Sequence, residues 1–453
     1  MRRRVVITST ALVLGTILAA LWWWIDGNRM PEIEHPEPVP IPEPNAFDLL
    51  VEAAEGVPDQ GAAVSEAVSG IIRDPETGEW RDSTIEDKRR VVESNYEALD
   101  LIRQALEHDF EYPDLDRGLV GGSVRHLGAL RMLGRLLSVE IEVHLANERH
   151  DAAMTSVLDC IELGRRVGDA PLVLPALTGV AITGIGIQPV PEIIPYLNAH
   201  ELRSAIRRVE THAKGPFDMA AIVAHQGRVD LVQLESALKH ENWRLGLAKM
   251  DEREHWRDFD LLLTEYEDLP VLQRLKTRLR SWRYHKGRVV TANQQMITQV
   301  RDAVELPFPE STDHFPKPHS RIPAPMDEGE TENFRKTWFR LLVETTIREM
   351  LLATLALEAW HRENGQYPER LEDLTSDLLQ SIPRDPFTAD APLLYRQDED
   401  GYVLYSIGPD GHDNGGEAME RPDEEDPIRR KRPRMDLPGD LVAGINLLRP
   451  PKE

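Results

Sequence analysis

The sequence predicts a mainly α-helical protein with an N-terminal transmembrane helix, a helical-hairpin domain and a C-terminal α+β module. Three observations predict this class: an uncharged apolar run near the N-terminus, helical periodicity through most of the chain, and a strand-like pair near its end. The expected parts are a cytoplasmic tip and anchor, a proline-rich linker, a helical domain, a second proline-rich linker and an α+β module of one long helix and a small antiparallel sheet. In order, they cover 1–27, 28–45, 46–305, 306–330 and 331–453.

Length and charge restrict the function classes. The chain has 453 residues, enough for two or three domains, and a formal net charge of −25. Such an acidic chain repels nucleic-acid phosphates, and by the same argument its overall charge disfavours an anionic membrane surface. Cys160 is the sole cysteine, which excludes a disulfide framework and a thiolate metal cluster. Its apolar neighbours predict a buried core position.

The first element is a membrane anchor. Val5 to Ile25 contains no charged residue over 21 positions, which is long enough to span a bilayer as a helix. Arginines at 2–4 precede this run and Asp26 follows it, so the positive-inside rule places the N-terminus in the cytoplasm and the rest outside. A cleaved signal peptide is the alternative. Tryptophans at 22–24 occupy the place of a small-residue cleavage site, which favours an uncleaved anchor.

A second apolar run, Ala170 to Pro191, also lacks charged residues over 22 positions. Its four prolines and Gln188 would interrupt a spanning helix, because in lipid each freed backbone group needs an internal partner. The expectation is a buried helix within the helical domain.

The intervening elements follow from local patterns. Met30 to Asn45 alternates proline with acidic residues and predicts an extended spacer, after which Asn45 caps a helix. Residues 124–168 predict two helices joined at 147–151 as an antiparallel hairpin, and Gly215 marks the end of a helix from about 199. In segment 85–109 an amphipathic face is formed by Val91, Tyr96, Leu99, Ile102 and Leu106.

The C-terminal part begins with a long helix over about 333–363, which Asn364 and Gly365 end. A short helix at 369–374 and a hairpin follow, in which 392–396 and 401–407 are the strands. The stripe expected on the long helix consists of Phe334, Trp338, Leu341, Thr345, Arg348, Leu352, Leu355 and Ala359.

No motif for a reaction is present: the sequence contains no P-loop, no G-x-S-x-G and no H-E-x-x-H. The protein is therefore not expected to be an enzyme. One loop, Ser406 to Gly416, offers metal-site chemistry through Asp410, Asp413 and several glycines. Hard cations such as calcium take six to eight oxygens from carboxylates and backbone carbonyls. On spacing alone, an ordinary polar turn and a metal site both fit this loop.

The C-terminal part contains an ordered set of turn, proline, glycine and aspartate positions. They are Gly365, Tyr367, Pro368, Leu374, Ile382, Pro383, Asp385, Pro386, Phe387, Ser406, Gly408, Asp410, Gly411, Gly415 and Gly416. This set resembles the C-terminal domain of the major pseudopilin of type II secretion systems. The resemblance implies a small α+β module with calcium in the 406–416 loop, bound with the help of a later aspartate. Asp440 fits that position best and Asp426 is its rival.

The chain departs from this family at its N-terminal end. Residues 1–25 contain no glycine followed by an apolar helix with an early glutamate, which the family's peptidase site requires, and a helical domain separates anchor and module. Assembly into a fibre is therefore not expected.

These observations predict an anchored protein of the bacterial inner membrane, single-pass, with most of its chain extracytoplasmic. Its expected role is binding or scaffolding, with the membrane and envelope or secretion proteins as partners and no nucleic acid. The alternative is an envelope-associated hydrolase with a site in the helical domain, which would require acids and histidines that converge in a deep pocket.

Overall fold

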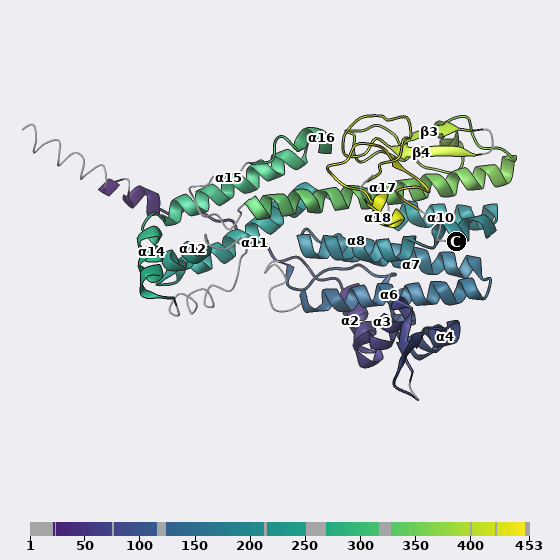
Figure 1. The fold of residues 1–453 in the computed structure, drawn as a ribbon, viewed down its shortest axis with the longest axis horizontal. Coiled ribbons are helices and arrows are strands. Elements are labelled where there is room, and N and C mark those ends of the chain that lie inside the picture. Colours follow the sequence, from purple (N-terminus) through teal and green to yellow (C-terminus); the bar gives the residue numbers. More distant parts are fainter. Residues whose placement is uncertain are drawn as a thin grey trace, which may run out of the picture. The chain divides into compact units, whose positions relative to one another are not determined.

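The structure is a computed structural model that describes residues 21–22, 24–74, 77–115, 124–212, 215–250, 269–316, 328–398, 401–421 and 424–448. In this part the chain is mainly helical and carries a small antiparallel sheet near its C-terminal end, which confirms the predicted fold class at that level (Figure 1). All but the last few residues of the predicted anchor lie outside the described residues.

The described residues pack as two compact units, and each unit joins segments that are far apart in the sequence. The first unit contains the described parts of 1–37, 223–303 and 313–335. The second contains the described parts of 38–222, 304–312 and 336–453. The five-part division expected from the sequence stays a prediction.

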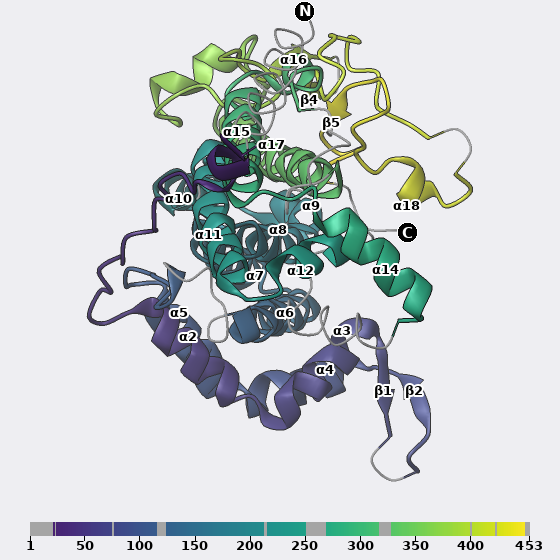
Figure 2. The same ribbon diagram turned by 90° about the vertical axis from the view of Figure 1, so that its left-hand side faces the viewer.

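The second unit begins with α2 (Ala46–Glu55), whose start is set by Asn45. The Asn45 side chain accepts a hydrogen bond from the Phe47 backbone N–H at 3.1 Å, which confirms the predicted cap. The helix α3 (Ala62–Ser69) follows. A hairpin of β1 (Ile71–Arg73) and β2 (Trp80–Asp82), which the sequence did not predict, then extends from it (Figure 2).

The segment predicted as one amphipathic face forms two helices, α4 (Ile85–Ser94) and α5 (Tyr96–Ala105). Asn95 separates them, and its amide donates to the Val91 carbonyl at 2.7 Å. Because the helix axis is interrupted there, Tyr96 leaves the predicted face and is 68% exposed. The prediction for Tyr96 is therefore wrong, while the other four residues of that face are buried.

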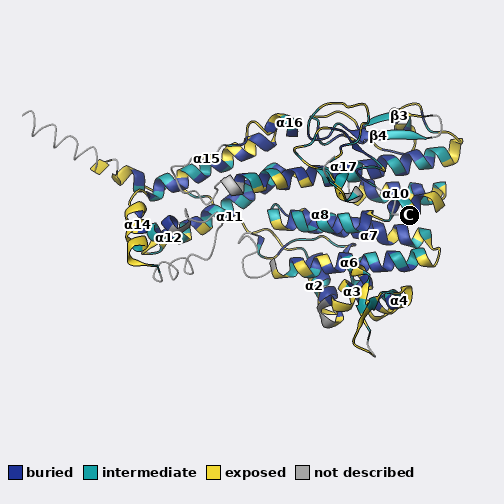
Figure 3. Cartoon of the chain, viewed as in Figure 1, coloured by how far each residue is buried: buried dark blue, intermediate teal, exposed yellow. Residues whose placement is uncertain are grey.

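The centre of the second unit consists of α6 (Val124–Ala146), α7 (His150–Gly168) and α8 (Val173–Ile187), which pack on one another (Figure 3). The α6–α7 pair confirms the predicted hairpin. After α8, α9 (Val190–Ile193) and η3 (Ile194–Tyr196) lead to α10 (Ala199–His212). Gly215 follows with a φ of +88°, as expected beyond a helix end.

The predicted apolar run 170–191 coincides with α8. A methyl group added at Gly179 would lie 2.3 Å from the Gly164 carbonyl oxygen of α7, so the two helices approach closely. Cys160 is buried on α7, as predicted, and burial raises the pKa of its thiol to about 12. By length and composition alone Val173–Tyr196 could cross a membrane, and 44% of its apolar window is buried. Its position outside the membrane stays a prediction.

The first unit is built from α11 (Met219–Lys239), α12 (Trp243–Met250), α14 (Val271–Ser281) and α15 (Lys286–Val304). A core cluster joins α11, α12, α15 and the segment before α15, and Met30 and Ile33 pack against it. Its members include Leu234, Leu238, Trp243, Leu247, Tyr284 and Val290.

Two parts of the segment predicted as a linker, 306–330, are helical. Phe308 starts a short helix, α16 (Phe308–Ser311), and is buried in an aromatic cluster with Trp338, Phe339 and Phe387. The long helix α17 (Glu328–Asn364) begins about five residues earlier than expected and ends at the predicted residue. Every residue of its predicted stripe is buried, and Gly365 follows with a φ of +76°.

The C-terminal part packs a sheet beside the second-unit portion of α17 (Figure 1). A 3-10 helix, η4 (Leu371–Ser376), stands where a short helix was expected. The strands β3 (Leu394–Gln397) and β4 (Tyr402–Ser406) confirm the predicted hairpin, with Leu394 opposite Tyr405. A short helix, α18 (Pro427–Arg430), precedes β5 (Leu441–Val442), which pairs antiparallel with β4 and which the sequence did not predict.

Candidate metal centre

The pairing of β5 with β4 places the third predicted ligand beside the predicted loop. Ser406, where the loop begins, lies opposite Leu441, and Asp440 directly precedes β5. A parallel bridge between Ala418 and Asp440 fixes the other end of the loop against the same segment. Residues 406–418 therefore form a loop that both begins and ends against residues 440–441.

Hydrogen bonds connect the loop and the tail at the predicted carboxylates. The Asp440 carboxylate accepts from the backbone N–H of Asn414 at 3.2 Å and of Gly416 at 2.7 Å. Asp410 Oδ2 accepts from the Gly439 backbone N–H at 3.0 Å and from Asn414 Nδ2 at 3.3 Å. Asn414 thus contacts both carboxylates, and Asp410 and Asp440 each join the loop to the tail.

Asp413 occupies the other side of the same turn. Its Oδ1 accepts from the Gly415 backbone N–H at 2.8 Å and from the Tyr405 hydroxyl at 3.1 Å. Burial raises the pKa of Asp440, and the negative charge of Asp413 contributes in the same direction. The loop therefore concentrates negative charge at a fully buried carboxylate.

A fourth aspartate, Asp385, fixes the start of the loop. Its Oδ1 accepts from the Ser406 hydroxyl at 2.7 Å, and its Oδ2 accepts from the Ile407 backbone N–H at 2.9 Å. The side chain is 2% exposed, and burial raises its pKa, with a contribution from the charge of Asp440. The sequence identified Asp385 as part of the family-like pattern without assigning it a role; its place between two prolines of that pattern was the available clue.

Two glycines permit the close approach of loop and tail. Gly408 has a φ of +69°, and a methyl group there would lie 2.9 Å from the Gly439 carbonyl oxygen. Gly439 has a φ of +111°, and a methyl group there would lie 2.9 Å from the Met419 Cα. Since both positions are left-handed and crowded, only glycine fits them without strain.

The rival aspartate lies elsewhere in the module. Asp426 Oδ1 accepts from the Arg429 backbone N–H at 3.4 Å, at the start of α18, and its Oδ2 lies 3.7 Å from Arg429 Nε. The structure thus joins Asp410 and Asp440 at one turn and engages Asp426 at a short helix.

The donor chemistry suits a hard cation, because carboxylates, an asparagine amide and backbone carbonyls all present oxygen. Each carboxylate has about four acceptor sites, so the hydrogen bonds above leave lone pairs for a metal. Among the described residues, no group of three or more His, Cys, Asp or Glu side chains is placed so that it could hold a metal ion by itself. A calcium ion would thus need backbone carbonyls in addition to the aspartates.

A second cluster of acids lies within the helices of the second unit. Glu140, Asp159 and Glu162 are buried on α6 and α7. Each of these acids forms an ion pair with an arginine. Arg103 Nη2 lies 2.6 Å from Glu140, and Arg208 Nη2 lies 2.6 Å from Asp159. Arg166 Nη2 lies 3.0 Å from Glu162. Arg103 Nε also lies 3.1 Å from Asp159 Oδ2, so these ion pairs connect α5, α6, α7 and α10. Asp159 and Glu162 stand among apolar residues in the sequence, so their pairing with distant arginines could not be predicted from it.

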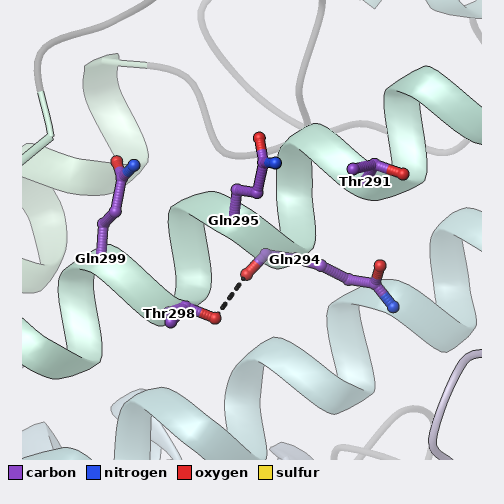
Figure 4. Close-up of a pocket in the computed structure, with 5 residues that line it drawn as sticks. All are labelled: Thr291, Gln294, Gln295, Thr298 and Gln299. Atoms are coloured by element: carbon purple, nitrogen blue, oxygen red, sulfur yellow. Dashed lines mark hydrogen bonds between the residues drawn. The ribbon is translucent and has the colours of Figure 1, made fainter.

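A shallow pocket lies on α15 in the first unit, and Figure 4 shows the side chains that line it. They are Thr291, Gln294, Gln295, Thr298 and Gln299. The Thr298 hydroxyl donates to the Gln294 carbonyl of its own helix at 2.9 Å. These described lining residues are all uncharged and come from one helix, so they bring together no acid or base from different elements.

Comparison of the chain with protein-family models, with curated proteins and with solved structures gave no match.

Proposed function

We propose that this chain is a membrane-anchored binding or scaffolding protein whose C-terminal module is stabilised by a calcium ion. The observation that carries the proposal is the double connection of the 406–416 loop to the tail through Asp410 and Asp440. Two carboxylates held on one turn repel each other unless a cation or hydrogen-bond donors offset their charge. A bound cation would also link two segments that are distant in the sequence.

The calcium ligands we assign are Asp410, Asp413 and Asp440, with backbone carbonyls of the same loop. When bound, calcium would supply positive charge at an acidic turn beside the buried Asp440 carboxylate. The chain's own contribution is geometric: Asp385 holds the start of the loop, and β5 holds Asp440. Because the ion would bind the folded module alone, it would stabilise that state by mass action.

The proposed location is the bacterial inner membrane, with the chain after Ile25 extracytoplasmic. The support comes from the charge asymmetry around the apolar run and from Trp22, Trp24 and Ile25, which are each more than half exposed. Envelope or secretion proteins are the partners that this location and the family resemblance favour.

Thermal unfolding of the full chain in detergent, with calcium or with a chelator, tests the proposed ion. At a free calcium concentration about 100 times the Kd, the expected gain is about 2.7 kcal/mol. Asp410→Ala and Asp440→Asn should lose this gain. Asp426→Ala is the matched control and should keep it.

Two outcomes contradict the assignment. Equal melting temperatures in calcium and chelator would show that no stabilising ion binds. A calcium gain that survives in Asp410→Ala and disappears in Asp426→Ala would transfer the site to the rival aspartate.

A further inference from the structure

The helix α14 buries polar residues and exposes apolar ones, which is the opposite of a typical surface helix. Its buried residues are Thr277 and Ser281, which are small and polar. Large apolar side chains are exposed instead, each between 53% and 76%: Val271, Leu272, Leu275, Leu279 and Trp282. A helix of a soluble protein turns its apolar stripe to the core. Since no described residue of the chain covers the outward stripe of α14, the stripe fits an apolar partner.

The outward residues form one continuous stripe. Leu272, Leu275, Leu279 and Trp282 follow one another at intervals of three, four and three, which places them on one helix face. Basic residues flank that face, with Arg278 on one side and Lys276 and Arg280 on the other. Long basic side chains beside an apolar stripe can extend their charges to a polar boundary.

The local charge is opposite to that of the whole chain. Between Leu269 and Arg288 there is no Asp or Glu, while the chain as a whole carries −25. The basic residues of this stretch are Arg274, Lys276, Arg278, Arg280, Arg283, Lys286 and Arg288. Overall charge disfavoured an anionic membrane surface, but this stretch complements one.

Residues at the end of the predicted anchor contact the segment that directly follows α14, and both belong to the first unit. Asn28 Nδ2 lies 3.2 Å from His285 Nδ1, and the Lys286 backbone N–H donates to Asn28 Oδ1 at 3.4 Å. The Arg244 guanidinium lies 6.0 Å from the centroid of the Trp24 ring and donates through Nε to the Tyr284 carbonyl at 3.2 Å. The point where the anchor ends is thus connected to the residues that follow α14.

We propose that α14 is an interfacial helix that docks on a lipid bilayer containing anionic phospholipids, with its apolar stripe at the level of the headgroups. An apolar face flanked by arginine and lysine is the composition that such helices use. A second copy of the chain would bring two basic helices together, and their like charges would repel. The proposal rests on the membrane anchorage proposed above and adds a second contact beside the anchor.

The test uses the full chain, reconstituted in vesicles of phosphatidylcholine and phosphatidylglycerol in equal amounts. Cys160 is buried, so an environment-sensitive fluorophore can be attached selectively to a new cysteine. Leu279→Cys places the probe on the apolar stripe, and Gln273→Cys, at an exposed position away from the stripe, is the matched control. We expect the probe at 279 to shift to the blue and to be quenched by nitroxide-labelled lipid, while the probe at 273 stays in water.

Two further measurements distinguish lipid from a second copy of the chain as the partner of the stripe: removal of basic residues and variation of the protein-to-lipid ratio. Arg278→Ala and Lys276→Ala, each in the Leu279→Cys chain, should each lower the docked-to-undocked ratio about fivefold. Quenching that is independent of the protein-to-lipid ratio supports lipid. A probe at 279 that leaves water only as protein density rises would show that a second copy covers the stripe, which overturns the proposal.

The vesicle experiment distinguishes an error in the proposed anchor from an error in the proposed docking of α14. If the chain floats with the vesicles and the probe at 279 remains aqueous, the docking of α14 is wrong and the anchor stands. If the chain does not float with the vesicles, the anchor is wrong and the docking of α14 falls with it.

Discussion

The Asp87 carboxylate is buried at the start of α4, where it accepts hydrogen bonds from the Thr84 backbone N–H at 2.9 Å and from Arg81 Nη1 at 2.6 Å. The Thr84 hydroxyl is also within reach of the Asp87 backbone N–H, so the two residues form a capping box. The Arg81 guanidinium and these donors hold the pKa of Asp87 well below its usual range. The burial of the Asp87 carboxylate depends on its ion pair with Arg81. That residue lies on β2, a strand that the sequence did not predict.

Asp87→Ala should destabilise the second unit by about 1 to 2 kcal/mol, the cost typical of a lost helix cap. Because the folded-state pKa is lowered, the carboxylate contributes stability above about pH 4 and loses it as pH falls through the folded pKa. The difference between wild type and variant should therefore shrink in acid. Urea titration at neutral and acid pH measures this.

Glu86→Ala is the control, since Glu86 lies in the same first turn, is exposed and pairs only weakly with Arg89 at 3.3 Å. Its effect should stay within about 0.5 kcal/mol. Equal losses in the two variants would show that buried hydrogen bonds of Asp87 contribute nothing beyond general helix-end charge.

At the scale of elements, sequence patterns predicted the helices, caps and hairpins that are determined by neighbouring residues. The Asn45 cap, the α6–α7 hairpin, the α17 stripe and the β3–β4 hairpin are confirmed. The failures depend on distant partners. Phe308 lies in a proline-rich stretch that looks like a linker, and only the aromatic cluster on α17 and Phe387 makes it core.

The candidate site divides in the same way. The glycines and aspartates of the 406–416 loop were visible as local chemistry, and Asp440 was found only through a family resemblance. What places Asp440 at the loop is the two-residue strand β5, which is too short for a periodic pattern. The structural role of Asp385 could not be predicted, because its partners Ser406 and Ile407 lie about twenty residues away.

The α7–α8 contact supplies a test of element packing. In Gly179→Ala the new methyl group would lie 2.6 Å from the Gly168 Cα, so the helices must separate. We expect a loss of about 1 to 3 kcal/mol, measured by thermal unfolding.

Gly184→Ala on the same helix is the matched control, because a methyl group there meets nothing within 4 Å. Alanine favours helix over glycine by about 1 kcal/mol, so this variant should be neutral or more stable. Stability that is unchanged in Gly179→Ala would mean that α7 and α8 do not pack as closely as described.

At the scale of the whole molecule, we propose one membrane crossing, which would place the chain after Ile25 outside the cytoplasm. The apolar helix α8 is the element that could reverse this, since a second crossing would return the C-terminal module to the cytoplasm. Its close packing on α6 and α7 favours a position within the second unit.

Alkaline phosphatase fusions after Gly168 and at the C-terminus separate these topologies. We expect both fusions to be active, because both sites follow the anchor and α8 does not cross. Green fluorescent protein at the same sites should stay dark when exported through the general secretion route. Activity at Gly168 alone would show that α8 spans the membrane, and inactivity at both sites would reverse the orientation of the anchor.

The central claim is that calcium joins the 406–416 loop to the tail that carries Asp440. Hydrogen exchange of the full chain, followed by mass spectrometry with calcium or with a chelator, tests it most directly. The account predicts that peptides covering 406–416 and 437–447 slow together in calcium, while the β1–β2 hairpin at 71–82 exchanges at the same rate in both conditions. Unchanged exchange in the loop and the tail would contradict the claim.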